Sequence, residues 1–254
     1  LEFRRVLFRL FAFNRFAHMA YPTVVMDSPL SRELTPIASS WSVPQLQDHL
    51  ARALSDEGPA LSTSLLNQPQ VKARVALVVR TSGSTGDPKS VALTSRALLA
   101  NARATHKYLD AKPGDRWSLL LPTSHIAGIN VLIRALEMGT APLSVGDQAD
   151  FTAIVPTQLF RALNGDSELL RHLQACRAVL VGGGALEPQL RQQAETSNIS
   201  VVESYGMTES CGGVVYDGTA LDGIEFQLID GRIAFRGNQI EPEYLDASLE
   251  LRSE

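Results

Sequence analysis

Between residues 75 and 204, short apolar runs alternate with longer stretches in which apolar residues recur at helical spacing. The short runs, most of them rich in β-branched residues, predict buried strands at 75–79, 117–121, 152–155, 178–181 and 199–204. The amphipathic stretches between them predict helices at 95–109, 129–138, 156–163 and 187–195. This alternation indicates an α/β domain with layered, largely parallel sheets and flanking helices.

A loop and a helix precede the alternation. Residues 27–44 are rich in Ser, Pro and Thr and predict an entry loop. Ser42 and Pro44 suit a helix start, and apolar residues then recur at helical spacing from Leu46 to Leu54. We therefore expect one amphipathic helix ahead of the first strand of the alternation.

The pattern changes again after Tyr216. Apolar and polar positions alternate across residues 223–237 on both sides of an Asp-Gly pair, which is a strong signal for a β-hairpin. We expect this hairpin to begin a small β element near the C-terminus.

The stretch LEFRRVLFRLFAFNRF at the beginning of the chain differs in composition from the rest. It holds five of the nine phenylalanines together with four arginines. The arginines interrupt each apolar run before it reaches the length of a signal-peptide core or a membrane span. We expect residues 1–18 to be a non-native leader, with Met19 or Met26 as the natural start.

Composition narrows the classes of function. The chain has 254 residues, 44% of them hydrophobic and 20% charged, which is enough for the core of one large domain or two small ones. A formal net charge of -4 gives no electrostatic reason to expect nucleic acid or an anionic membrane as a partner. No segment has the length of a membrane span. Cys176 and Cys211 lack metal-ligand spacing, and we expect packing thiols in a reduced, cytoplasmic protein.

A hydroxyl-rich loop, TSGSTGDPKS, follows the predicted strand at 75–79. A glycine turn after a strand can direct backbone N–H groups at an anion, and hydroxyl side chains add donors. Residues 81–89 of the loop supply two turn glycines, four hydroxyls and one positive charge: Gly83, Gly86, Thr81, Ser82, Ser84, Thr85 and Lys89. It is not a Walker A motif, because Asp87 and Pro88 separate the glycine from the lysine. The loop predicts a phosphate site, with an ordinary surface turn as the alternative.

Two further segments run from a predicted strand into a glycine turn. In VVESYGMTES, Tyr205 can stack on a base, Thr208 can donate to a phosphate and Glu209 can bind Mg²⁺. In AVLVGGGAL, three glycines would let a flat ligand approach the backbone, namely Gly182, Gly183 and Gly184. The alternatives are a core tyrosine, a solvated loop carboxylate and a plain turn.

Together and in this order, the three segments resemble the adenylate-forming superfamily of acyl-CoA synthetases, luciferases and peptide-synthetase adenylation domains. TSGSTGDPKSV is similar to the signature loop of that family without departure, and YGMTE is similar to its adenine and magnesium motif. Within the family, LPTSHIAGINVLIRAL, IVPTQLFRAL and SYGMTESCGGVVYDG look most like the o-succinylbenzoate-CoA ligases of menaquinone biosynthesis. The resemblance runs from about Val75 to Tyr244.

This resemblance implies a ligase that uses ATP, Mg²⁺ and coenzyme A. A small-molecule carboxylate would attack the α-phosphorus of ATP and release pyrophosphate, and the thiol of coenzyme A would then displace AMP. The implied binding residues are Thr81 to Lys89 for the β- and γ-phosphates, Gly182 to Gly184 and Tyr205 around adenine, and Gly206 and Met207 within the same motif. The implied catalytic residues are Lys89, Thr208 at the α-phosphate and His125 beside the reacting carboxylate, and Glu209 is the implied metal ligand. A packed or capping histidine is the alternative for His125.

Other residues mark departures from the family or lie outside its motifs. Glu203 stands where the family often has asparagine, two residues before the motif tyrosine. An o-succinylbenzoate ligand would keep one carboxylate after the other is activated, and burial of that charge requires a partner. Arg134 and Arg161 are candidates, with a solvent-facing helix arginine as the alternative for both. The remaining histidines are expected at the surface: His18, His49, His106 and His172.

The family continues with a Thr-Gly-Asp motif, a hinge and a small C-terminal domain that brings a catalytic lysine, and this sequence holds none of these. We therefore expect residues 19–254 to be an incomplete N-terminal AMP-binding domain of a ligase. A non-catalytic nucleotide-binding remnant and an adenylation domain that loads a carrier protein are the alternatives. The sequence leaves the oligomeric state open.

Overall fold

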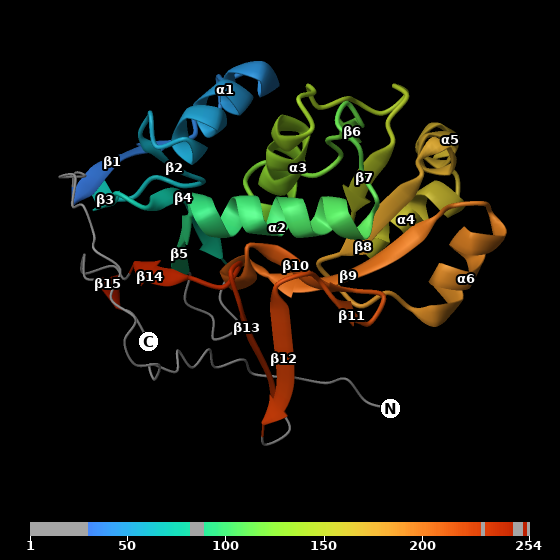
Figure 1. The fold of residues 1–254 in the computed structure, drawn as a ribbon. Coiled ribbons are helices and arrows are strands. Elements are labelled where there is room, and N and C mark those ends of the chain that lie inside the picture. Colours follow the sequence, from blue (N-terminus) through green and yellow to red (C-terminus); the bar gives the residue numbers. More distant parts are fainter. Residues whose placement is uncertain (1–29, 82–88, 230–231, 246–250, 253–254) are drawn as a thin grey trace.

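Two β-sheets with helices between and beside them make up the fold (Figure 1). The structure is a computed structural model that describes residues 30–81, 89–229, 232–245 and 251–252. The predicted α/β class is confirmed, whereas the predicted leader at 1–18 and its two candidate start residues lie outside the described residues. Within the described ranges, no helix is long and apolar enough to cross a membrane.

The described helices follow the predicted order, with one addition. They are α1 (Val43–Leu54), α2 (Ser95–Tyr108), α3 (Ile126–Glu137), α4 (Pro156–Leu163), α5 (Ser167–Ala175) and α6 (Pro188–Thr196), with a single 3-10 turn, η1 (Thr208–Ser210). Ser42 caps α1 as predicted, because its Oγ accepts from the backbone N–H of Gln45 while the Gln45 side chain accepts from the N–H of Ser42. α5 was not predicted, although Asp166 caps it by accepting from the N–H of Leu169.

A seven-stranded sheet forms one side of the molecule, in the order β15-β14-β5-β4-β2-β1-β3. Its strands are β1 (Ser31–Pro36), β2 (Ala60–Ser62), β3 (Gln70–Lys72), β4 (Val75–Thr81), β5 (Lys89–Thr94), β14 (Glu243–Leu245) and β15 (Leu251–Arg252). β1, β2 and β4 run parallel, while β3, β5, β14 and β15 pair antiparallel to their neighbours. β1 lies where an entry loop was predicted, and that prediction is wrong for 31–36 because pairing with two distant strands overrides the local composition.

A six-stranded sheet forms the other side, in the order β11-β10-β9-β8-β7-β6. Its strands are β6 (Trp117–Ser118), β7 (Phe151–Ile154), β8 (Ala178–Gly182), β9 (Val201–Met207), β10 (Gly212–Tyr216) and β11 (Thr219–Ala220). β6 to β9 are parallel, as the strand and helix alternation predicted, and β10 and β11 are antiparallel. The predicted hairpin is present as β12 (Ile224–Ile229) paired with β13 (Arg232–Gly237), and it projects from the sheets (Figure 1).

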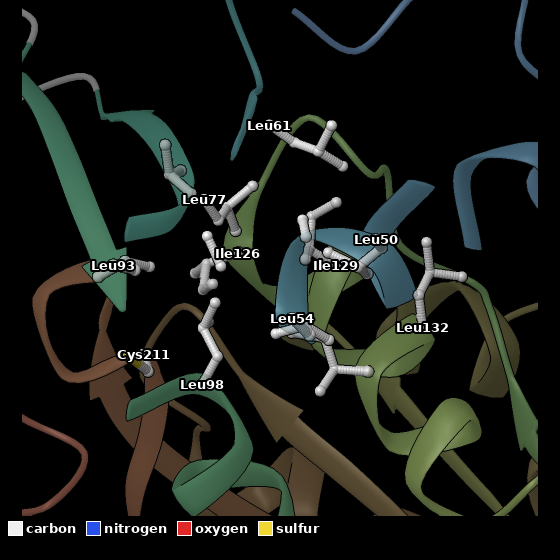
Figure 2. Packing of buried hydrophobic residues seen from close by; sticks show 14 of the residues in the cluster. Leu50, Leu54, Leu61, Leu77, Leu93, Leu98, Ile126, Ile129, Leu132 and Cys211 are labelled. Atoms are coloured by element: carbon white, nitrogen blue, oxygen red, sulfur yellow. The ribbon is translucent and has the colours of Figure 1, made fainter. Parts of the chain in front are cut away.

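Helices α2 and α3 lie between the two sheets and bury side chains against both. Leu98 and Ile129 belong to a core cluster with Leu77 and Leu93 of the seven-stranded sheet (Figure 2). Val131, two residues after Ile129, belongs instead to the cluster on the six-stranded sheet. Because α3 is covered from both sides, its residues are apolar almost all round rather than along one stripe.

Helices α4 to α6 cover the opposite face of the six-stranded sheet. Along β8, Val179 and Val181 pack with the residues of α4 to α6, whereas Ala178 and Leu180 belong to the cluster shared with α2 and α3. This alternation follows from the two-residue period of a strand. Because both faces of β8 are covered, its sequence is a continuous apolar run. Its carboxyl end runs into the glycines that begin at Gly182.

Candidate functional site

The ends of β8 and β9 bring two of the predicted segments together. These strands are parallel neighbours, and Gly182 pairs with Ser204. Tyr205 directly follows Ser204, so the glycine turn and the tyrosine lie at the same edge of the sheet. This edge is formed by the carboxyl ends of parallel strands, where α/β proteins commonly bind ligands.

The three consecutive glycines meet different demands of the fold. A Cβ at Gly182 would lie 2.8 Å from the carbonyl oxygen of Ser204, so the close approach of β8 and β9 requires glycine there. Gly183 has φ +76°, in the left-handed region. Gly184 is exposed, and a Cβ there would lie 3.9 Å from Pro156, in ordinary contact. The fold therefore requires glycine at positions 182 and 183 but not at 184. A bound ligand would be a reason for glycine at position 184.

Tyr205 is not a core tyrosine. Its side chain is 40% exposed, and its ring lies 6.2 Å from the ring of Phe235 at an angle of 39°. Phe235 in turn lies 6.4 Å from Phe226 on the β12–β13 hairpin. Partial burial raises the pKa of the Tyr205 hydroxyl, which is therefore neutral at pH 7. An exposed aromatic face beside a glycine turn can accept a flat base by stacking.

The predicted phosphate loop connects β4 to β5. Thr81 and Lys89 pair across these antiparallel strands, and the Thr81 hydroxyl donates to the carbonyl oxygen of Lys89 at 3.4 Å. Lys89 is exposed at the first position of β5. The other loop residues, Ser82, Gly83, Ser84, Thr85 and Gly86, lie outside the described residues. The structure thus fixes the two ends of the loop at one end of the β4–β5 pair.

The turn that carries Thr208 and Glu209 packs against the strand that carries Lys89. η1 connects β9 to β10 and contacts β5, although the two segments are more than one hundred residues apart in the sequence. The Ser210 Oγ accepts from the N–H of Met207 at 3.1 Å and shapes the turn. Thr208 and Glu209 are half-buried. Two of the predicted segments, the phosphate loop and the metal motif, therefore meet at β5.

The described residues supply one carboxylate for a metal at this place. In the described part of the chain, no group of three or more His, Cys, Asp or Glu side chains could hold an ion. Mg²⁺ is commonly bound through one or two carboxylates and the phosphates of its nucleotide, not by a cage of protein ligands. Glu209 with a neighbouring hydroxyl is a hard oxygen set of that kind, so the residues fit a magnesium ion that enters with a nucleotide.

His125 is exposed at the first turn of α3. It occupies the backbone N-cap position but its side chain makes no capping hydrogen bond, so the capping alternative is wrong. The next residue, Ile126, lies in the same buried cluster as Cys211, which follows η1 (Figure 2). The start of α3 and the η1 turn are thus joined through the core, and the imidazole points away from that core into solvent.

Comparison with known proteins identifies the family. The AMP-binding enzyme family matches residues 20–234, most of the chain. The chain belongs to this family. A Mycobacterium tuberculosis protein named as a probable 2-succinylbenzoate-CoA ligase is 38% identical over 224 residues, covering 77% of this chain and 58% of that protein. A 2-succinylbenzoate-CoA ligase of Enterococcus faecalis is 32% identical, covering 61% of this chain and 35% of its own length.

Solved structures of the same family share the fold. Escherichia coli MenE, solved with an analogue of OSB-AMS, is 25% identical with a TM-score of 0.58, covering 82% of this chain and 52% of that one. Bacillus subtilis MenE in complex with ATP and magnesium is 22% identical with a TM-score of 0.58, covering 78% and 55%, and shows likeness of fold alone. The chain therefore spans little more than half the length of the Mycobacterium tuberculosis relative and of the Escherichia coli structure.

The glutamate that departs from the family pattern is held in an ion-pair group. The Glu203 Oε2 lies 3.8 Å from the Arg191 Nη1 of α6, and the same nitrogen lies 2.8 Å from the Asp217 Oδ1. The Asp217 carboxylate also accepts from the N–H of Glu203 at 3.0 Å. These contacts tie β9 to α6 and to the end of β10 beside Tyr205.

Of the two arginines considered for a second substrate carboxylate, only one faces solvent. Arg161 is exposed and pairs with Asp166 at 3.1 Å. Arg134 is 4% exposed, and its Nη2 donates to the Tyr216 hydroxyl at 3.3 Å and the Thr105 hydroxyl at 3.4 Å. No carboxylate in the described ranges pairs with Arg134, and burial lowers the pKa of its guanidinium. The solvent-facing alternative is wrong for Arg134.

Two histidines expected at the surface are buried. Burial and the nearby charge of Arg134 lower the pKa of His106 to about 4. The His172 Nδ1 accepts from the N–H of Gly146 at 3.3 Å, so its Nε2 carries the proton and donates to the Ser118 Oγ at 2.8 Å. Because this imidazole donates to the serine, it does not activate Ser118 as a nucleophile. His49 is half-buried and stacks on Trp41 with ring centroids 3.9 Å apart.

Both cysteines are buried, as expected for packing thiols. Burial raises the pKa of Cys176 to about 12 and raises the pKa of Cys211 further, so neither thiol is a reactive thiolate at neutral pH.

Sequence reasoning missed two asparagines that contact the η1–β10 segment. The Asn130 Nδ2 donates to the Cys211 carbonyl at 2.8 Å, and the Asn101 Nδ2 donates to the Gly213 carbonyl at 2.8 Å. Both side chains are almost fully buried. The available signal was a polar residue inside an otherwise apolar helical stretch, most clearly in AGINVLIRAL.

Proposed function

We propose that this chain is the nucleotide-binding part of an ATP-dependent acid-CoA ligase that acts through an acyl-adenylate, with 2-succinylbenzoate as its acid. Membership of the AMP-binding family and the names of its relatives support this function. The observation that carries the proposal is the packing of η1 against β5. η1 carries Thr208 and Glu209, and β5 begins at Lys89, where the signature loop ends.

In this proposal the triphosphate lies between the loop and the η1 turn. Lys89 and the loop hold the β- and γ-phosphates, Thr208 donates to the α-phosphate, and Glu209 holds Mg²⁺. The adenine lies between Tyr205 and the glycines at 182–184, a place that the exposed ring and the exposed Gly184 leave accessible. When bound, the metal neutralises phosphate charge, which lowers the cost of nucleophilic attack.

The first proposed step forms the adenylate. An oxygen of the acid attacks the α-phosphorus, the bond from that phosphorus to the bridging oxygen breaks, and pyrophosphate leaves with its electron pair. His125 lies beside the acid in this proposal. In the second step, the coenzyme A sulfur attacks the acyl carbon, its proton passes to solvent, and the C–O bond to AMP breaks. The chain contributes orientation and charge, and alignment of the reacting atoms can supply roughly 7–11 kcal/mol of the barrier reduction.

A dicarboxylic acid would explain the buried cation at the six-stranded sheet. Arg134 is placed among neutral partners, and an unpaired buried charge is costly. We propose that the second carboxylate of 2-succinylbenzoate supplies the missing negative charge. Free buried cysteines are compatible with a reducing compartment, and we propose a cytoplasmic location.

Nucleotide binding by the chain tests the phosphate assignment directly. Lys89→Ala and Glu209→Gln should each weaken Mg-ATP binding about tenfold or more, because each removes a charged partner of the phosphates or the metal. Lys112→Ala and Glu137→Gln make the same changes of charge in surface ion pairs outside the proposed site and should leave the Kd unchanged. Titration calorimetry measures all four. Unchanged Mg-ATP affinity in both site variants would remove the assignment.

A longer protein tests the reaction. The chain can be joined to the remaining C-terminal part of the Mycobacterium tuberculosis relative and assayed for pyrophosphate release with 2-succinylbenzoate, benzoate and succinate. Release that is fastest with 2-succinylbenzoate and is followed by a CoA thioester supports the proposal. Pyrophosphate release without thioester would favour a carrier-loading adenylation domain, and binding without release would favour a non-catalytic nucleotide binder.

A further inference from the structure

We propose that Asn101 and Asn130 are positioning residues that fix the 208–213 turn and thereby aim Glu209 at the metal. The inference rests on the proposed function for the identity of the ligand. Its structural part, that two buried amides hold this turn, stands on contacts among described residues.

The turn adopts a backbone that its own residues do not favour. Cys211 is a non-glycine residue in the left-handed region, with φ 57° and ψ 24°. Such a conformation costs free energy and persists only where the surroundings enforce it. Gly212 follows with φ +110°, also a backbone that L side chains rarely adopt. Glycine tolerates such a φ, so it is the left-handed Cys211 that needs support from contacts outside the turn.

Helices α2 and α3 donate hydrogen bonds that hold the turn. Asn130 of α3 donates to the Cys211 carbonyl and Asn101 of α2 donates to the Gly213 carbonyl, each at 2.8 Å. The two side chains are 3% and 0% exposed, and the Cys211 carbonyl is buried with its donor, whereas Gly213 is half-buried. The Cys211 side chain enters the core cluster between the same helices and β5 (Figure 2). The turn is held from inside the protein at Cys211 and at Gly213.

Gly212 leaves the space that the Asn130 side chain needs to reach the turn. A Cβ at Gly212 would collide with the Asn130 Nδ2, so glycine there is what allows the amide to reach the Cys211 carbonyl. On the other side of the turn, the Ser210 hydroxyl donates to the Gly212 carbonyl at 2.8 Å. Thr208 and Glu209 thus occupy the outer, half-buried part of a turn whose inner part is immobilised.

The tests separate positioning from general support of the fold. Asn130→Ala and Asn101→Ala are measured beside Gly212→Ala, which disturbs the same contact from the opposite side. Gln47→Ala is the matched control, because the Gln47 Nε2 likewise donates from a helix to a backbone carbonyl, that of Thr140, outside the turn. In Asn130→Ala, the amides of 208–213 should exchange hydrogen about tenfold faster, whereas Gln47→Ala should leave them unchanged.

Nucleotide binding supplies the second readout. In Asn130→Ala, the Kd for Mg-ATP should rise about fivefold or more, while the Kd for ATP in EDTA should change less than about twofold, because the residue acts through the metal ligand. In the double variant with Glu209→Gln, Mg-ATP binding should be no weaker than in Glu209→Gln alone. Independent effects that add, or equal weakening with and without Mg²⁺, would overturn the positioning role and leave only a structural one.

The exchange data also distinguish this inference from the function beneath it. Unchanged exchange at 208–213 in all three turn variants would overturn the inference even if the wild-type chain bound Mg-ATP as proposed. If the wild-type chain bound ATP equally well with and without Mg²⁺, the proposed metal site and its positioning would both fail. Faster exchange in the variants would then show that the failure lies in the ligand assignment and not in the contacts.

Discussion

Helices α2 and α3 carry two buried polar groups that lie one helical turn apart. The asparagine pair, Asn101 and Asn130, contacts backbone carbonyls at the beginning of β10, while Thr105 and Arg134 contact the Tyr216 hydroxyl at its end. On each helix the two positions are four residues apart and so share a face. Both groups therefore connect the same two helices to the same strand.

The two groups differ in how their burial is compensated. The asparagines are neutral, and each donates to a backbone carbonyl, although the Asn101 Oδ1 has no hydrogen-bond partner among the described residues. Arg134 is charged, its partners are neutral hydroxyls and the face of Trp117 at 5.0 Å, and its Nε has no hydrogen-bond partner among the described residues. A neutral amide that donates to a backbone carbonyl can stabilise a fold, whereas a buried charge without a counterion costs free energy. The asparagines therefore support the turn, whereas Arg134 has no carboxylate partner among the described residues.

The largest expected effect comes from removing the charge. In the extended enzyme, Arg134→Met should lower kcat/KM for 2-succinylbenzoate on the order of 10²-fold, because a buried carboxylate would lose its partner. The melting temperature should stay the same or rise, since an apolar side chain of similar length removes the desolvation cost. Benzoate, which lacks the second carboxylate, is the control acid. Equal losses with both acids would show that Arg134 does not recognise that carboxylate.

Replacement of an asparagine of the pair should lower stability, in contrast to replacement of Arg134. Asn101→Ala should cost about 1–2 kcal/mol of the free energy of unfolding, because the half-buried Gly213 carbonyl loses its donor. Urea denaturation of Asn101→Ala and Arg134→Met in parallel measures the difference. The contrast fails if the arginine variant loses as much stability as the asparagine variant.

The pH dependence of stability tests the surroundings of Arg134, because His106 lies near this arginine. Since the pKa of His106 is lowered to about 4 in the folded state, the unfolded chain binds more protons between about pH 4 and 6.5. Stability from this residue is present above about pH 6.5 and is lost as the pH falls toward 4. Between pH 6.5 and 5, the unfolding free energy of His106→Gln should therefore fall by about 1–2 kcal/mol less than that of the wild type.

This experiment needs its own reference. Unfolding free energies at pH 6.5 and 5 are compared for wild type and variant, and His172, whose pKa is also lowered by burial, contributes to both. An unchanged pH dependence in His106→Gln would mean that its imidazole is accessible to protons in the native state.

The smallest expected effect concerns the hydroxyl between the two helices. The Thr105 Oγ1 lies 3.0 Å from the Tyr216 hydroxyl and 3.4 Å from the Arg134 Nη2. Thr105→Val keeps the shape and removes that partner, which should cost about 1 kcal/mol by thermal denaturation. Combined with Arg134→Met, the cost should shrink, because one of the two groups that bond to the hydroxyl is already gone. A cost that stays the same in both backgrounds would assign it to Tyr216 alone.

Much of the fold could be predicted because each parallel strand and its helix carry their own periodicity. β8 ends at the glycines as predicted, and α4 begins at the predicted proline. β1 and β14 could not be predicted, since their pairing depends on strands far away in the sequence. The helix expected from residue 129 begins at 126, where tertiary packing of Ile126 extends the apolar face.

The candidate site divides in the same way. The loop, the glycine turn and the YGMTE motif could be recognised from residue type and order, because phosphates, bases and metals each demand particular side chains. The contacts of Asn101, Asn130 and Arg134 could not, because an asparagine or arginine in a helix has the same local signature whether it faces water or a buried carbonyl.

The sequence by itself determined the α/β class, the strands that end in glycine turns and the family to which those turns belong. Only the tertiary structure decided that η1 packs against β5, that two asparagines hold the turn behind it and that Arg134 is buried among neutral partners. The physical reason is the separation along the sequence over which each effect acts. Periodicity and turn chemistry act between residues a few positions apart, whereas burial and hydrogen-bond satisfaction depend on which distant segments the core brings together.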